Sequence, residues 1–138
     1  MKHLVDTNIL SEARREGGHP TVLAKLASID DEDLFLSVIT VGEIARGIAR
    51  LPAGKRLPEW FAQLERHFAG RILLIDAAIA HRWGELTAAA EKAGRTLHAS
   101  DALIAATALQ HGLRLLTRND RDFEGNGVTV VNPMTDAD

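Results

Sequence analysis

Three carboxylates occupy positions from which acidic side chains can act together. Asp6 directly follows a short apolar stretch, Glu43 lies in the first turn of a predicted helix, and Asp101 lies in the first turn of another. Carboxylates gathered at one point repel one another and raise one another's pKa, so a fold keeps such a cluster where a cation neutralises it. We therefore expect Asp6, Glu43 and Asp101 to converge on one divalent-metal site.

The types of donor at this expected site indicate which ion it would hold. The chain has no cysteine, and its 6 histidines show no spacing typical of a metal-binding pair. A set of carboxylate oxygens suits Mg²⁺, or Mn²⁺ as a substitute, better than Zn²⁺. Asp101 is the most informative member, because its helix is apolar nearly all round. A charge that enters a buried helix needs a partner.

Three residues are candidates for a fourth polar position in this site. Asn119, Asp120 and Asp122 all follow the fourth predicted strand. Asp76 follows a strand as well, but its place before a long helix favours an N-cap. Position alone therefore does not separate ligands from caps.

Each acid of the trio also has a purely structural interpretation. Asp6 could cap the helix that follows it. The sequence TVGE at 40–43 matches a capping box, in which Glu43 returns to the backbone of Thr40. Asp101 could complement the positive end of its helix dipole.

Strands alternate with helices along the whole sequence. Short apolar stretches predict five strands, at residues 4–5, 34–38, 71–75, 113–116 and 128–131. Apolar residues at helical spacing and Gly or Pro stops predict six helices, at 7–15, 20–29, 40–51, 57–68, 77–93 and 100–110. This alternation predicts a three-layer α/β/α sandwich with a mostly parallel central sheet. In such sheets ligands bind beyond the carboxyl ends of the strands, where the acidic residues recur.

Length and composition limit the class of protein. The chain has 138 residues, which suits a single domain over 1–138. No signal peptide fits the N-terminus, and the longest apolar run is shorter than the roughly 20 residues that span a membrane. The lack of cysteine is compatible with the reducing cytoplasm. The formal net charge of −3 signals no basic nucleic-acid-binding surface, so a polyanionic substrate would need a few arginines or a metal.

Five short segments along the chain occur in an order that is typical of a known family. They are LVDTNILS at 4–11, SVITVGEIARG at 37–47, ASDALIAATA at 99–108, LTRNDRDF at 116–123 and VNP at 131–133. Together they resemble the PIN-domain ribonucleases and, within that family, the VapC-type toxins of bacterial toxin–antitoxin pairs. Members often carry an acid where Asn119 stands and a tryptophan where Met134 stands. Asp120 or Asp122 could supply the missing charge.

The resemblance implies a fold, an activity and partners. The fold would be the PIN-like α/β/α sandwich, and the activity Mg²⁺-dependent endoribonuclease cleavage by metal-activated water. The partners would be RNA, a VapB-type antitoxin and a second copy of the chain. The metal ligands would be Asp6, Asp101 and Glu43.

Further side chains would support this site. Thr7, Asn8 and Thr117 would orient the carboxylates. Arg46 and Arg50 follow Glu43 at i+3 and i+7, so they either pair with it on the helix surface or contact RNA phosphate. Arg118 is a similar candidate for RNA phosphate.

Two other functions are open. A catalytically degenerate PIN-like module would bind a partner and leave RNA intact, which Asn119 supports. A phosphoacceptor receiver domain is also a small α/β chain with an acidic pocket, and Asp76 would be its phosphorylated residue. A receiver needs a second acid beside Asp6 and a lysine after the fifth strand, whereas no lysine follows Lys92.

Overall fold

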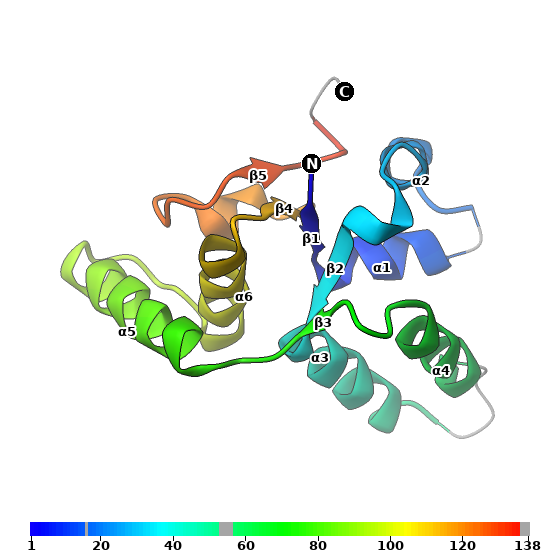
Figure 1. Cartoon of the computed structure of the whole chain (residues 1–138), viewed down its shortest axis with the longest axis horizontal. Helices are drawn as coiled ribbons and strands as arrows, with labels where there is room; N and C mark the ends of the chain where they lie inside the picture. Colours follow the sequence, from blue (N-terminus) through cyan, green and yellow to red (C-terminus); the bar gives the residue numbers. More distant parts are fainter. Residues whose placement is uncertain (16, 53–56, 136–138) are drawn as a thin grey trace.

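The strands form one parallel sheet. The computed structural model describes residues 1–15, 17–52 and 57–135. The sheet order is β3 (Ile72–Leu73), β2 (Leu34–Ser37), β1 (His3–Val5), β4 (Arg114–Leu116) and β5 (Val130–Val131), and each neighbouring pair is parallel (Figure 1). The chain therefore builds outward from β1 to β3 and then restarts on the other side with β4. The boundary between β1 and β4 is the point at which the strand order reverses.

Helices cover both faces of this sheet, as the sequence predicts. The helices are α1 (Thr7–Arg14), α2 (Pro20–Ala27), α3 (Val38–Ala49), α4 (Leu57–His67), α5 (Ala77–Lys92) and α6 (Ala99–His111). Figure 1 shows α5 and α6 together on one side of the molecule and α1 to α4 on the other.

Neighbouring residues of a strand enter different hydrophobic clusters. Val5 and Leu116 pack with apolar side chains of α1 to α3, whereas Leu4 and Leu115 pack with α6. Successive side chains of a strand point to opposite faces, so each strand contributes to both layers. The predicted three-layer sandwich is therefore confirmed.

Helix α6 has more buried residues than any other described helix, and it carries Asp101 in its first turn. Its buried residues are Ala102, Ile104, Ala105, Ala106, Thr107 and Ala108. Small side chains let α6 approach the sheet closely while α5 covers it from outside. The helix ends at Gly112, whose φ of +64° is left-handed and suits glycine. The predicted burial of this helix is confirmed.

The start of α3 differs from the prediction. The helix begins at Val38 and not at Thr40, because the Ser37 hydroxyl caps it by accepting a hydrogen bond from the Ile39 backbone at 3.0 Å. Thr40 is thus inside the helix, and Glu43 lies in its second turn. The predicted capping box between Thr40 and Glu43 is wrong, and so is the first-turn position of Glu43.

The other differences concern element ends. The third strand is Ile72–Leu73, shorter than the predicted 71–75. Two short 3₁₀ helices occur in segments that were not predicted to be regular, η1 (Asp31–Asp33) and η2 (Asp120–Phe123). The second matters for function, because it carries two of the three candidates for the fourth polar position.

Candidate functional site

The candidate site lies where the strand order reverses. The backbone nitrogen of Asp6 donates to the carbonyl oxygen of Leu116 at 2.9 Å, so the first residues beyond β1 and β4 are held side by side. Asp6 and Thr117 are those residues, and both are buried. An open parallel sheet leaves its ligand-binding crevice at this point.

Asp6 is both a helix cap and the centre of a hydrogen-bond network. Its Oδ1 accepts from the backbone nitrogen of Thr7 at 2.8 Å, which caps α1. Its Oδ2 accepts from the Thr117 hydroxyl at 2.8 Å and from Asn8 Nδ2 at 3.2 Å. The interpretation of Asp6 as the cap of α1 is therefore correct, and its role as a metal ligand stays a prediction.

The hydroxyl of Thr117 joins three segments of the chain. It donates to Asp6, and it accepts from Asn8 Nδ2 at 3.1 Å and from the backbone nitrogen of Asn119 at 3.1 Å. One donor and two acceptor positions are all that a hydroxyl has, so this group is fully used. These contacts give Asn8 and Thr117 the orienting position that was expected of them.

Glu43 reaches the site from α3. Its Oε1 accepts from the Thr7 hydroxyl at 2.8 Å, which ties α3 to the start of α1. Burial raises the pKa of Glu43, and the charge of Asp6 raises it further, while the bond from Thr7 lowers it. Within the described residues, no ion pair joins Glu43 to Arg46 or Arg50.

The negative charges of three other acids act on Asp101. Burial is the largest cause that raises its pKa to about 6, followed by the charges of Asp122, Asp6 and Glu43. Burial also raises the pKa of Asp6, where the charge of Asp122 adds to the effect. Four carboxylates therefore share one region of repulsion, and Asp122 is the open candidate that belongs to it.

The remaining open candidates take other places. Asn119 contributes its backbone nitrogen to Thr117 and precedes η2 without a side-chain cap. Asp120 is the first residue of η2 and Asp122 the third, and both are exposed. The structure thus favours Asp122 over Asn119 and Asp120, on electrostatic grounds.

The donor set fits a hard divalent cation by chemistry but is not a closed cage. Among the described residues, no three His, Asp or Glu side chains stand close enough together to enclose an ion. Mg²⁺ keeps several of its waters and is usually bound through one or two carboxylates. An open group of carboxylates whose repulsion raises the pKa of Asp6, Glu43 and Asp101 suits such an ion.

Glu12 was not predicted from the sequence as a functional residue, yet it contacts a residue next to the site. It lies on α1, and its Oε2 accepts from Arg118 Nη1 at 2.8 Å. Arg118 follows Thr117 directly, and its backbone nitrogen donates to Asn8 Oδ1 at 3.0 Å. The expected contacts of Arg46, Arg50 and Arg118 with RNA phosphate stay predictions.

A groove adjoins the acids between α1, α3 and α4. It has a volume of about 210 Å³, and Thr7 and Glu43 form the end next to the site. Trp60 lines its other end, with the Arg14 guanidinium 5.7 Å from the centre of the indole ring. This groove gives the acid site an apolar extension.

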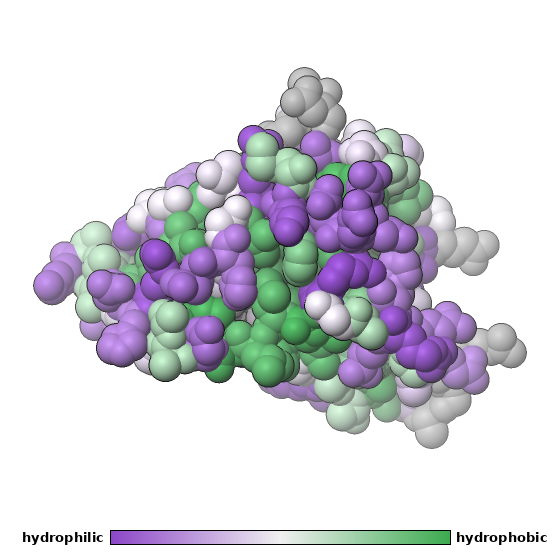
Figure 2. Space-filling model, in the orientation of Figure 1, coloured by the Kyte–Doolittle hydropathy of each residue, from purple (hydrophilic) through white to green (hydrophobic). Residues whose placement is uncertain are grey.

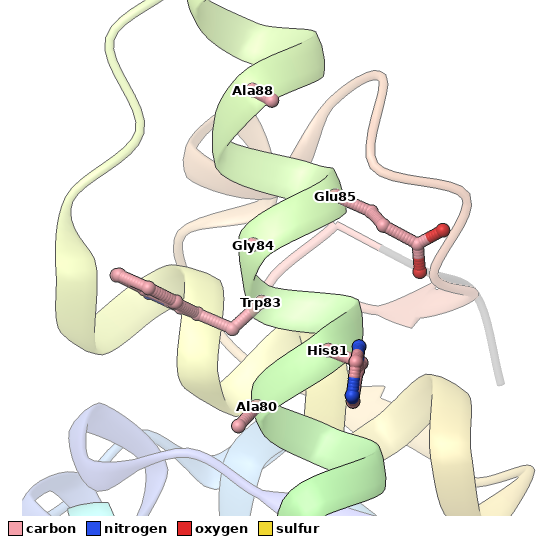
Figure 3. A pocket seen from close by; sticks show the side chains of 6 residues that line it. All are labelled: Ala80, His81, Trp83, Gly84, Glu85 and Ala88. Carbon is pink, nitrogen blue, oxygen red and sulfur yellow. The ribbon is translucent and has the colours of Figure 1, made fainter.

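Two further surface features lie away from the acids. A shallow depression of about 540 Å³ lies on α5; in Figure 3, Trp83 points to one side of the helix and His81 and Glu85 to the other. Figure 2 shows a hydrophobic area over the connection from β3 to α5, where Leu74 is 70 % exposed. In the described part of the chain, no helix is long and apolar enough to cross a membrane.

Comparisons with known proteins agree with this architecture. Residues 3–127 match the family model for the PIN domain. The chain is 39 % identical to toxin FitB of Neisseria gonorrhoeae, over 96 % of this chain and 99 % of that protein. It is 36 % identical to the VapC ribonuclease Y4jK of Sinorhizobium fredii, over 97 % and 99 % of the two chains.

Solved structures give the same result. The crystal structure of FitAcB from Neisseria gonorrhoeae superposes with a TM-score of 0.89 at 38 % identity, covering 96 % of this chain and 99 % of that one. A toxin–antitoxin complex from Klebsiella pneumoniae superposes with a TM-score of 0.70 at 30 % identity, covering 96 % and 98 %. The resemblance read from five short segments is confirmed, and the chain belongs to the PIN-domain family, among its VapC-type members.

Proposed function

We propose that this protein is a Mg²⁺-dependent endoribonuclease and the toxin of a type II toxin–antitoxin pair. The observation that carries the proposal is the shared repulsion of Asp6, Glu43, Asp101 and Asp122 at the edge where the strand order reverses. A fold tolerates such a cluster when a cation neutralises it. Membership of a family that includes proteins named ribonucleases supports RNA as the substrate.

The residues of the site divide the work. Asp6 and Asp101 would hold the ion, Glu43 would hold it directly or through water, and Asp122 would complete the negative region. Thr7, Asn8 and Thr117 hold three carboxylate oxygens, both of Asp6 and Oε1 of Glu43, through the hydrogen bonds already described. A bound Mg²⁺, or Mn²⁺ in its place, supplies charge neutralisation at the phosphate and a more acidic water.

The reaction would be a hydrolysis. Water attacks the phosphorus and the bond to the 3′ oxygen breaks; a carboxylate of the cluster takes a proton from the attacking water, and the departing 3′ oxygen takes one from solvent. The products are a 5′-phosphate and a 3′-hydroxyl. Because the 2′-hydroxyl takes no part, preference for RNA would depend on the binding surface and not on the chemistry.

The proposal includes partners and a location. A VapB-type antitoxin and a second copy of the chain are the proposed protein partners, supported by the solved toxin–antitoxin complex and by the exposed hydrophobic area beside β3. The proposed location is the cytoplasm, where RNA and a newly made antitoxin are both present.

The direct test is cleavage of structured RNAs by purified protein with Mg²⁺, with Mn²⁺ and with a chelator. We expect cleavage that needs the metal and falls at least about 100-fold in Asp6→Asn and Asp101→Asn. Glu85→Gln, which removes an exposed carboxylate on α5, is the matched control and should cleave like the wild type. Equal activity in all four proteins would mean that a contaminating nuclease is being measured.

The alternatives make different predictions. A degenerate module would bind antitoxin and leave every RNA intact with either metal. A receiver would become phosphorylated at Asp76 by acetyl phosphate; here the Asp76 Oδ1 accepts from the Ile79 backbone at 2.9 Å as the N-cap of α5. This cap accounts for Asp76 without a receiver function.

A further inference from the structure

Glu12 is a buried carboxylate with a separate role for each oxygen. Its side chain is 8 % exposed. Oε1 accepts from the backbone nitrogen of His19 at 2.9 Å, at the turn between α1 and α2. Oε2 accepts from Arg118 at 2.8 Å and from Arg15 at 3.3 Å. The His19 bond and then the two arginines hold the pKa of Glu12 below its ordinary value, so the group stays ionised.

Arg118 is held at three points. Glu12 holds its guanidinium, Asn8 Oδ1 accepts from its backbone nitrogen at 3.0 Å, and Asn132 Nδ2 donates to its carbonyl at 3.1 Å. Asn8 and Glu12 are four residues apart on α1, so they lie one above the other on the same helix face. Two side chains on one face of α1 therefore bind Arg118, the residue that follows Thr117.

Arg118 lies between two parts of the acid site. The preceding residue, Thr117, donates its hydroxyl to Asp6. The following residues lead into η2, which carries Asp122. A shift of Arg118 would displace the hydroxyl that orients one carboxylate and the segment that carries another.

We propose that Glu12 and Arg118 are positioning residues of the acid site: their ion pair fixes Thr117 against Asp6 and η2 beside Asp101. The proposal rests on the proposed metal-dependent function, which it deepens. Neither residue holds the ion. The Arg118 side chain is 38 % exposed, and its guanidinium is bound to Glu12.

The chain offers a matched pair of variants. Arg118→Met and Arg15→Met each remove one guanidinium from the same Glu12 oxygen and keep an unbranched side chain. Only Arg118 belongs to the segment between Thr117 and η2, whereas Arg15 ends α1 with a side chain that is 60 % exposed. Both variants leave the bond from His19 to Glu12 in place, so the α1–α2 turn is retained. Arg118→Lys keeps the charge.

The first measurement needs neither metal nor RNA. Hydrogen exchange by NMR reports the backbone amide of Asn119, which donates to the Thr117 hydroxyl at 3.1 Å. We expect faster exchange at this amide in Arg118→Met and wild-type exchange in Arg15→Met. Equal exchange in the two variants would overturn the proposal.

The second measurement is Mn²⁺ binding in the absence of RNA. Residues that orient metal ligands typically change metal affinity by roughly 10- to 100-fold, so we expect a dissociation constant about tenfold higher in Arg118→Met. Arg15→Met should bind like the wild type, and Arg118→Lys should lie between. Glu12→Gln combined with Arg118→Met should be no weaker than the worse single variant, because the two residues act as a unit.

The outcomes separate this inference from the proposed function. Unchanged Mn²⁺ affinity with lost RNA cleavage in Arg118→Met would overturn the positioning role and make Arg118 an RNA contact. If the wild type neither binds Mn²⁺ nor cleaves RNA, the proposed function fails, and the exchange of the Asn119 amide still decides whether the Glu12–Arg118 pair orders the segment.

Discussion

The hydroxyl of Thr7 donates to Oε1 of Glu43 across 2.8 Å, and this bond joins the first turn of α1 to the second turn of α3. The backbone nitrogen of Thr7 also donates to Oδ1 of Asp6, the cap of α1. One residue therefore contacts two of the carboxylates that are proposed to hold the ion, and it keeps them in a fixed relation to each other.

Replacing Thr7 by valine tests this relation. The hydroxyl lowers the pKa of Glu43, so its loss should raise that pKa further and should reduce RNA cleavage by roughly tenfold. NMR titration of the Glu43 carboxyl measures the first effect. Thr87→Val is a suitable control, because the Thr87 hydroxyl bonds only to carbonyl groups of its own helix. An unchanged Glu43 titration in Thr7→Val would show that the bond is absent in solution.

Thr117→Val should damage both the fold and the site. The substitution removes one hydrogen bond from the buried carboxylate of Asp6 and one from the half-buried amide of Asn8, which typically costs about 1–3 kcal/mol in the free energy of unfolding. Thr107→Val is the comparison, since that buried hydroxyl bonds only to the Leu103 carbonyl. Denaturant unfolding and Mn²⁺ binding should separate the two variants. Comparable Mn²⁺ affinity in both would contradict the role given to Thr117.

The stability of the metal-free protein should depend on pH through the ionisation of Asp101. Its pKa is about 6 in the folded chain against an ordinary value of 3.8, so the folded state binds more protons between these values. The contribution of Asp101 to the free energy of unfolding is therefore greatest below pH 3.8. It is lost as the pH rises through about 6.

Asp101→Asn isolates that contribution. Asparagine resembles the protonated acid, so the melting temperatures of variant and wild type should be similar at low pH. As the pH rises to 7, the variant should become the more stable protein. Saturating Mg²⁺ should remove the difference by stabilising the wild type alone. A constant difference across the pH range would be incompatible with a raised Asp101 pKa.

Asp122 and Asp120 can be told apart by matched substitutions in η2. Asp122→Asn removes a charge that raises the pKa of both Asp101 and Asp6, so both values should fall. It should also weaken Mn²⁺ binding by roughly tenfold if Asp122 completes the site. Asp120→Asn removes an equal charge two residues away. Identical effects of the two changes would mean that only the local net charge matters.

The sequence predicted what local patterns determine. The apolar helix around Asp101, the strand before Asp6 and the alternation of strands and helices all depend on residues close in the chain. These patterns sufficed for the layers and for the edge of the sheet that carries the acids. They failed at α3, where Ser37 caps the helix and Thr40, the predicted cap, lies three residues later inside it.

Long-range partners were beyond the reach of these patterns. Glu12 looks like a surface residue of an amphipathic helix, and one of its two arginine partners is 106 residues away in the sequence. The choice between Asn119, Asp120 and Asp122 depended on η2, whose turn directs neighbouring side chains differently. No spacing rule within the segment 116–123 contains that information.

The bond between Asp6 and Thr117 also has a consequence for the order of synthesis. The two residues are 111 positions apart, and the first carboxylate leaves the ribosome long before the hydroxyl that orients it. At roughly 5–20 residues per second, translation of the intervening chain takes on the order of ten seconds. During that interval the nascent chain lacks β4, η2 and Asp122, so a growing polypeptide cannot yet assemble the acid cluster. Under the proposed function, a ribosome therefore finishes most of this chain before the acid cluster that would cleave RNA can form.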